Sequence, residues 1–229
     1  MIYLTGDLHG DESRLYAKDW FKLKKGDILI ILGDFGFLWN GGKKEKEVID
    51  WLGKRPYTVC FLDGAHENFD MLKKCRLTRW KGGKVRRVSG NLFHLCRGQI
   101  FKIDGVTFFT FGGGESEDRD GRIQGKTWWR QEMPTPNEMK EGALNLEENG
   151  QQVDYILTHE PPTLVKSAMA LRKGSELKTS HLNGYLQEID NECEFNHWYF
   201  GSMHEDRLIT PKHTCLFQKI IMLGSKEQI

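Results

Sequence analysis

The sequence predicts an α/β fold, a β-sandwich flanked by helices that forms one domain over residues 1–229. Two observations lead to this class. Apolar runs of strand length alternate with segments of helical spacing, which indicates parallel strands covered by helices. A glycine–aspartate pair also follows each of the first three runs, at the strand ends where α/β sheets collect ligands. No internal repeat or linker divides the 229 residues, a length that suits one sizeable domain.

The first third contains three predicted strands, Ile2–Thr5, Ile28–Leu32 and Tyr57–Leu62. Each is a short, nearly continuous apolar run, as expected of a strand buried on both faces of a parallel sheet. The turn-forming pairs that end them are Gly6-Asp7, Gly33-Asp34 and Asp63-Gly64. Because the carboxyl ends of parallel strands meet at one edge of the sheet, we expect a binding crevice there.

Helices are predicted between these strands, at Glu12–Lys24 and Lys43–Leu52. In each segment the apolar residues recur at a spacing that places them on one face of a helix. The residues expected to face the sheet are Leu15, Trp20, Phe21, Leu23, Val48, Ile49 and Leu52. This alternation is what favours parallel pairing of the three strands.

The middle of the chain predicts shorter strands at Leu92–Leu95, Gln99–Ile103 and Val106–Phe111, the last two joined by an Asp104-Gly105 hairpin turn. The segment Gly112–Pro136 is rich in glycine and charge, and we interpret it as a long functional loop.

The last third predicts helices, strands and one segment that is irregular or partly helical. The helices are Pro136–Glu148 and His181–Asn191, the strands are Val153–Thr158, His197–Gly201 and a closing strand Leu216–Leu223, and the partly helical segment is Pro161–Ser180. The strands at 153–158 and 197–201 each stop shortly before a histidine.

Composition excludes some classes of protein. No run approaches the roughly 20 apolar residues that a membrane helix needs, so no membrane partner is expected. The five cysteines are an odd number without a Cys-x-x-Cys pair, which is typical of reduced thiols rather than a disulfide or zinc framework. The N-terminus lacks the features of a signal peptide, so a cytoplasmic location is expected.

The net charge of +1 hides a basic stretch over residues 73–102 that contains no acidic residue. Its cations are Lys73, Lys74, Arg76, Arg79, Lys81, Lys84, Arg86, Arg87, Arg97 and Lys102. One interpretation is a surface that binds nucleic acid or a nucleotide. The other is a solvated helix end followed by an edge strand that lysine and arginine protect against aggregation.

Six polar residues follow apolar strands and carry the chemistry. They are Asp7, His9, Asp34, His66, His159 and His204. Taken singly, such an aspartate is usually a turn residue, and such a histidine is usually a core or surface group. Converging at the strand ends, however, they would need a cation to balance them. A mixed aspartate and histidine set suits Mn, Fe, Zn or Co better than Mg or Ca.

The joint pattern is more specific than any member of it. Five motifs come in order, each after a hydrophobic strand: Gly-Asp-x-His-Gly at 6–10, Gly-Asp at 33–34, Gly-x-His-Glu at 64–67, Thr-His at 158–159 and Gly-x-x-His at 201–204. With these motifs the chain resembles the calcineurin-like metallophosphoesterases over almost its whole length, and especially their small bacterial and phage-type members.

The resemblance implies a role for each of these residues. Asp7, His9 and His204 would bind a first metal, Asp34 would bridge two metals, and His159 would bind the second. His66 would not be a ligand but the general acid that protonates the leaving group. The implied activity is metal-dependent hydrolysis of a phosphate ester by metal-activated water, with Glu67 orienting neighbouring hydrogen bonds.

The chain departs from the family pattern at two positions. Ala65 stands where the family has an asparagine ligand, and Ser202 stands where it has a histidine ligand. Both losses fall on the second metal, so we expect that site to be weakened and the activity to be impaired. Three explanations are open: natural divergence to a one-metal or inactive relative, deliberate substitution, or replacement of the ligands by water or another side chain.

In the Gly112–Pro136 loop we select Arg122 as a substrate-binding residue, because a guanidinium above the metals could hold a phosphate bidentately. A charged loop that is simply solvated is the alternative. Trp128 and Trp129 are interpreted as packing anchors of the loop rather than a base-stacking platform.

The sequence therefore predicts a phosphoric ester hydrolase, a phosphatase or phosphodiesterase. Phosphomonoesters, phosphoproteins, dinucleoside polyphosphates and phosphodiesters all suit such a core. The alternative is a catalytically weak or inactive relative that acts as a nucleotide-binding, nucleic-acid-binding or regulatory protein.

Overall fold

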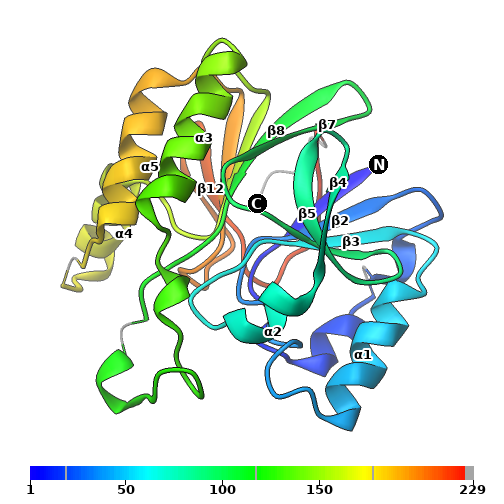
Figure 1. Cartoon of the computed structure of the whole chain (residues 1–229). Helices are drawn as coiled ribbons and strands as arrows, with labels where there is room; N and C mark the ends of the chain where they lie inside the picture. Colours follow the sequence, from blue (N-terminus) through cyan, green and yellow to red (C-terminus); the bar gives the residue numbers. More distant parts are fainter. Residues whose placement is uncertain (19, 117, 177, 225–229) are drawn as a thin grey trace.

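The computed structural model describes residues 1–18, 20–116, 118–176 and 178–224, so the last five residues of the predicted domain lie outside it. Two β-sheets pack face to face, and helices cover both outer sides (Figure 1). The predicted α/β sandwich flanked by helices is confirmed. No helix within the described ranges is long and apolar enough to cross a membrane.

The first sheet has seven strands, of which the central four are parallel. In spatial order they are β13 (Ile221–Met222), β1 (Ile2–Thr5), β2 (Ile28–Ile31), β3 (Thr58–Phe61), β6 (Leu92–Leu95), β5 (Gly83–Ser89) and β4 (Arg76–Trp80). All four residues of β2 are buried, as its unbroken apolar run predicts for a parallel strand covered on both faces.

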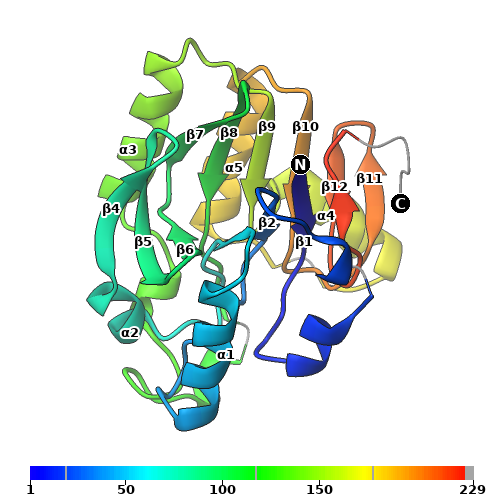
Figure 2. The ribbon, with the colours of Figure 1, turned by 90° about the vertical axis from the view of Figure 1, so that its right-hand side faces the viewer.

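The second sheet has six strands, and its central four are also parallel. In spatial order they are β11 (Arg207–Thr210), β12 (His213–Cys215), β10 (His197–Phe200), β9 (Tyr155–Thr158), β8 (Val106–Phe111) and β7 (Gln99–Ile103). Figure 2 shows β7 to β10 side by side, with α5 behind them.

The helices divide between the two outer faces. Helices α1 (Lys43–Gly53) and α2 (Phe69–Lys74) cover the first sheet, and α3 (Pro136–Glu148), α4 (Thr163–Lys173) and α5 (His181–Glu192) cover the second. A third apolar cluster, which includes Leu4, Ile30 and Phe108, fills the space between the sheets. Each sheet is therefore buried on both faces, by helices on the outside and by the other sheet on the inside.

Local signals explain where several helices begin and end. Thr135 and Glu138 form a reciprocal capping box, and Pro136 occupies the first turn, so α3 starts where the sequence predicts. Helix α4 ends at Gly174, which takes a left-handed conformation with φ of 65°. The segment 161–180 is thus partly helical, as expected.

The basic stretch forms elements that the apolar pattern did not reveal. It contains the end of α2, the edge strand β4 and its partner β5, which are joined by a two-residue turn at Lys81-Gly82. Both turn residues have positive φ, 50° and 98°, as a tight hairpin requires. Arg76 and Arg79 are exposed on β4, as the edge-protection interpretation predicts.

Two expected elements are wrong in extent. Glu12–Lys24 is not an α-helix but two 3₁₀ turns, Glu12–Tyr16 and Trp20–Lys22. The first ends because the backbone of Ala17 adopts an extended conformation. Leu15, Trp20 and Leu23 are buried as expected, whereas Phe21 is 71% exposed.

The closing strand is also shorter than the predicted Leu216–Leu223, and only Ile221–Met222 pairs, antiparallel to β1. The carboxylate of Asp206 accepts hydrogen bonds from the backbone N–H groups of Phe217, Gln218 and Lys219. A loop whose N–H groups bind a side chain cannot offer them to a strand.

Candidate metal centre

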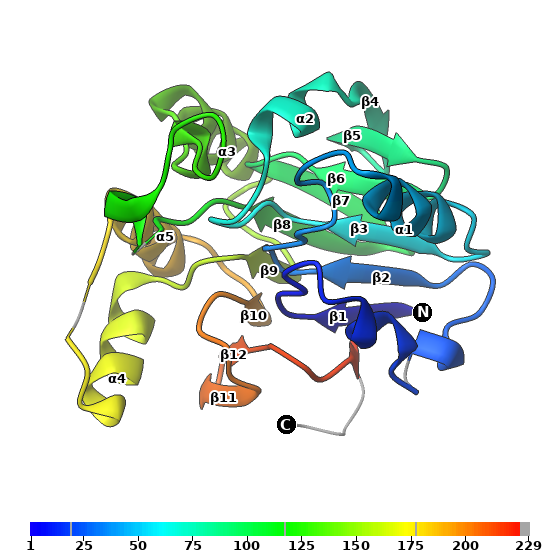
Figure 3. The same cartoon turned by 90° about the horizontal axis from the view of Figure 1, so that it is seen from below.

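The six candidate residues come from the carboxyl ends of five parallel strands, β1, β2, β3, β9 and β10, which belong to both sheets. Figure 3 shows β1, β2 and β3 side by side, with their carboxyl ends toward the region where β10 ends. The structure brings all six side chains together, in three overlapping groups whose ligand atoms lie within 4.8 Å of one another.

Two buried carboxylates form the centre of the site. Asp7 and Asp34 are 0% and 3% exposed. The buried ring of His159 lies between them, with Nδ1 3.6 Å from Asp7 Oδ1 and Nε2 3.7 Å from Asp34 Oδ1. These separations are too long for hydrogen bonds but suit groups that share a cation.

Two more histidines stand on the solvent side of Asp7. The Nε2 atoms of His9 and His204 are 2.9 Å apart, and His204 Nε2 is 3.2 Å from Asp7 Oδ2. His9 Nδ1 is 3.6 Å from Asp34 Oδ2, so the His9 ring lies against both carboxylates. Asp7, His9 and His204 form one of the three groups that could hold an ion.

His66 lies on the other side of Asp34. Its Nδ1 is 2.9 Å from Asp34 Oδ2, and its backbone N–H donates to Asp34 Oδ1 at 2.8 Å. About a third of the side chain is exposed, so the ring is held at one nitrogen while its other side faces a groove. That position differs from the buried position of His159.

The backbone at the site adopts conformations that most residues avoid. His9, Asp34, Ser202 and His204 have positive φ values of 50°, 42°, 58° and 51°. Aspartate and histidine tolerate this left-handed region better than most side chains. Such conformations cluster at functional sites, because the surrounding structure must hold them in place.

Glycines give the ligand side chains their room. A Cβ on Gly33 would lie 2.0 Å from His159 Nδ1, one on Gly64 would lie 2.1 Å from Asp34 Oδ1, and one on Gly201 would lie 2.3 Å from Asp7 Oδ1. Any other residue there would displace a candidate ligand. These three motif glycines are therefore as necessary to the geometry as the ligand side chains that they accommodate.

Burial and neighbouring charges act in opposite directions on the pKa values at the site. Burial raises the pKa of Asp34, but His159 and the hydrogen bonds from His66 outweigh it, and the net pKa lies below its ordinary value. Burial lowers the pKa of His159, yet Asp34 and Asp7 leave it raised overall. The Asp34 carboxylate thus remains ionised and favours a neighbouring positive charge, which a divalent cation would supply.

The two substituted positions both lie at the site. The backbone N–H of Ser202 donates to Asp7 at 3.1 and 3.2 Å, while its buried Oγ has no hydrogen-bond partner among the described residues. A cation or the water that it binds would satisfy this hydroxyl. Ala65 offers no donor atom in the same region, where its Cβ lies close to Gly114.

Comparison with known proteins supports this interpretation of the site. Residues 1–206 match the sequence profile of the family described as calcineurin-like phosphoesterase, which covers most of the chain. The chain belongs to the calcineurin-like phosphoesterase family. No curated protein matches it in a direct search.

Membership of the calcineurin-like phosphoesterases supports metal-dependent hydrolysis of phosphate esters in general. The donor set fits the divalent cations that the family uses, since two buried carboxylates and three imidazoles converge with an unpartnered hydroxyl beside them. The described helices and strands extend past the matched region to β13 at residues 221–222.

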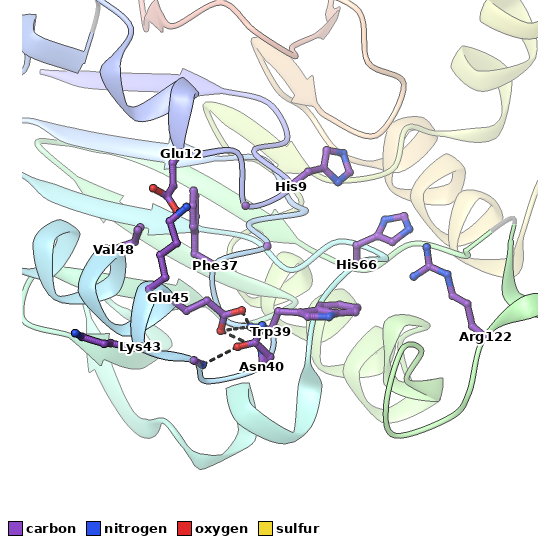
Figure 4. A pocket seen from close by; sticks show the side chains of 14 residues that line it. His9, Glu12, Phe37, Trp39, Asn40, Lys43, Glu45, Val48, His66 and Arg122 are labelled. Atoms are coloured by element: carbon purple, nitrogen blue, oxygen red, sulfur yellow. Dashed lines mark hydrogen bonds and ion pairs between the residues drawn. The ribbon is translucent and has the colours of Figure 1, made fainter.

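Arg122 lies in the groove that starts at His9 and His66 (Figure 4). Its guanidinium donates to Asp118 Oδ2 at 2.5 Å and to the carbonyl of Thr127 at 3.1 Å. The side chain thus lines the same groove as two of the candidate residues, and it already has a carboxylate partner. Trp129 is buried at 4% exposure and donates to Asp70, as expected of a packing anchor.

Two further buried carboxylates lie in the segment after β3. Glu67, which is expected to orient neighbouring hydrogen bonds, accepts from the N–H of Phe35 at 2.7 Å and so holds the loop after Asp34. Burial, and then the charge of Asp34, raise the pKa of Glu67. Asp63 forms a buried network with His94 and Arg97 directly behind the site. The sequence signal for that network was the Asp63-Gly64 pair, which we interpreted only as a turn.

Proposed function

We propose that this chain hydrolyses phosphate esters at a metal centre held by Asp7, His9, Asp34, His159 and His204. The observation that carries the proposal is the convergence of two buried carboxylates and three imidazoles at the carboxyl ends of strands from both sheets. Cations bound there would supply a nucleophilic water at neutral pH and positive charge for the phosphoryl oxygens. Mn, Fe, Zn and Co suit the donors best.

His66 is the proposed general acid. Asp34 holds its Nδ1, which orients the imidazole and leaves the opposite side of the ring toward the groove. Imidazole exchanges protons readily near neutral pH, so a leaving-group oxygen beside that face can take a proton as the ester bond breaks.

Arg122 is the proposed phosphate-binding residue. It lines the same groove as His66, and a guanidinium has five N–H donors, enough to keep Asp118 and still bind a phosphoryl oxygen. Its bonds to Asp118 and Thr127 would hold it at the rim of the site.

We expect the second metal to bind weakly, because Ala65 and Ser202 provide no amide or imidazole ligand. Calorimetric titration with Mn²⁺ should show one tight site in this chain, and a second should appear in the Ala65→Asn/Ser202→His double variant. Histidine tolerates the positive φ of position 202. Ala65→Val, which adds bulk without a donor atom, is the matched control. Two tight sites in the unaltered chain would contradict the prediction.

A binding or regulatory function through the basic stretch is the second candidate. The observation in its favour is the pair of exposed arginines on edge strand β4, Arg76 and Arg79. Hydrolysis of an alkyl phosphate with Mn²⁺, compared with a His66→Ala variant, separates the two, because an alkoxide leaving group needs the proton that His66 would donate. Absent turnover together with salt-sensitive nucleic-acid binding would favour the second candidate.

A further inference from the structure

A groove of about 620 Å³ leads away from the metal centre. It begins at His9 and His66, runs over Gly36, Phe37 and Trp39, and reaches the start of α1 (Figure 4). Its volume lies in the range that drug-sized ligands occupy and is far larger than a phosphate group requires. The rest of the groove is therefore available to the organic part of a substrate.

The proposed chemistry decides which part of the substrate enters the groove. A general acid must touch the leaving-group oxygen, and His66 lines the groove itself. With the phosphoryl group at the cations, the leaving group therefore extends past His66 and over Trp39. Figure 4 shows the indole of Trp39 in the groove, below His66 and to the left of Arg122 in this view.

The backbone of Trp39 is fixed from two directions. Its N–H donates to the carboxylate of Glu45, which also accepts from the N–H groups of Asn40 and Gly41. Its carbonyl accepts from the side chain of Asn68, the residue that caps α2. The N-terminal ends of α1 and α2 thus hold the same residue.

The indole is held as well, yet it stays partly exposed. Buried Trp129 packs edge-to-face against it, with ring centroids 5.2 Å apart, and Trp129 is in turn bonded to Asp70 of α2. An aromatic ring that is rigid, partly exposed and next to the proton donor loses little entropy when a second flat ring stacks on it.

We propose that Trp39 is a stacking platform for the leaving group, and that the preferred substrates are phosphate esters whose leaving group carries a flat aromatic ring. The inference rests on the proposed function, because it places the phosphoryl group at the metal centre. Two substrate sources share this chemistry, nucleotides and aryl phosphates. Stacking of a base on an aromatic side chain contributes roughly 5- to 150-fold in affinity.

The test measures binding rather than turnover, by calorimetry on the Mn²⁺-loaded protein. Three phosphonates that cannot be hydrolysed serve as probes: naphthylmethylphosphonate, the phosphonate analogue of adenosine monophosphate, and cyclohexylmethylphosphonate, whose ring is not flat. We expect the two flat-ring probes to bind about tenfold more tightly than the cyclohexyl probe. The tighter of the two identifies the source, nucleotide or aryl phosphate.

Substitution assigns that preference to Trp39. Trp39→Leu should remove the preference for flat rings and leave the affinity for the cyclohexyl probe within about twofold, while Trp39→Phe should retain most of it. Trp51→Leu is the matched control, since Trp51 lies on α1 against Arg55 and does not line the groove. If Trp39 had only a structural role, Trp39→Leu would weaken the binding of all three probes alike.

The outcomes distinguish a failure of the stacking platform from a failure of the proposed function on which it rests. Equal affinity for the three probes, or a preference that survives Trp39→Leu, overturns the stacking platform and leaves the proposed hydrolase intact. Failure of every phosphonate to bind overturns the proposed function, and the stacking platform with it.

Discussion

Replacing His66 with asparagine should lower kcat for an alkyl phosphate by about 10²- to 10⁴-fold, the usual contribution of a general acid. The ring of His66 is fixed by Asp34 at 2.9 Å and faces the groove, where the leaving group is expected. The loss should be much smaller for p-nitrophenyl phosphate, because nitrophenolate is a weak base and departs without a proton.

This dependence on the leaving group distinguishes proton donation from damage to the metal centre. His66 contacts Asp34, so metal content must be measured in the same preparations, and it should not change. His181→Asn is the matched control, because His181 is an exposed histidine at the start of α5, outside the six converging residues. Equal losses for both substrates, or loss of metal with the substitution, would rule out the assigned role.

Much of the fold could be predicted from the sequence because burial leaves a simple pattern in parallel strands. β2 is covered on both faces, so all its residues are apolar, and its end is marked by Gly33-Asp34. The candidate ligands follow from the same pattern. A polar residue directly after such a strand lies at the edge where the other parallel strands also end, whatever the distance along the chain.

The elements that could not be predicted lack this pattern. Strand β4 could be predicted only as one of two interpretations of the basic stretch, because its exposed Arg76 and Arg79 also suit a surface that binds nucleic acid. The run Leu216–Leu223 is apolar enough for a strand, but the carboxylate of Asp206, eleven residues before Phe217, accepts hydrogen bonds from the backbone N–H groups of residues 217–219. Partners this distant give no periodic signal.

The site shows the same division between local and distant information. The motifs supply both the ligands and the glycines that accommodate them, since Gly33, Gly64 and Gly201 give close approach to His159, Asp34 and Asp7 in that order. Trp39 has no such mark, because its position depends on Glu45, Asn68 and Trp129, which belong to three different segments. The ligands could therefore be predicted from short motifs, and the shape of the groove could not.

Arg97 should contribute more to stability than any surface arginine of this chain. It is 7% exposed and donates through Nε to the fully buried Asp63 at 2.8 Å, and through Nη2 to the carbonyls of Gln131 and Glu132. We expect Arg97→Met to lower the free energy of unfolding by about 3–5 kcal/mol, because it leaves a buried carboxylate without its cation. Arg79→Met, at an exposed edge position, should change it by less than about 0.5 kcal/mol.

The pH dependence of this difference identifies its cause. Burial raises the pKa of Asp63, but Arg97 and then His94 hold it below its ordinary value of 3.8. A carboxyl group whose pKa is lower in the folded state stabilises that state at pH values above its pKa in the unfolded chain. This contribution is lost as the pH falls toward the pKa of the folded state. The difference between Arg97→Met and the unaltered chain, measured by urea unfolding, should therefore be larger at neutral pH than in acid, where Asp63 becomes protonated and no longer needs its cation. A difference that is independent of pH would assign the loss to packing against Phe69 and the Gly112–Pro136 loop instead of to the ion pair.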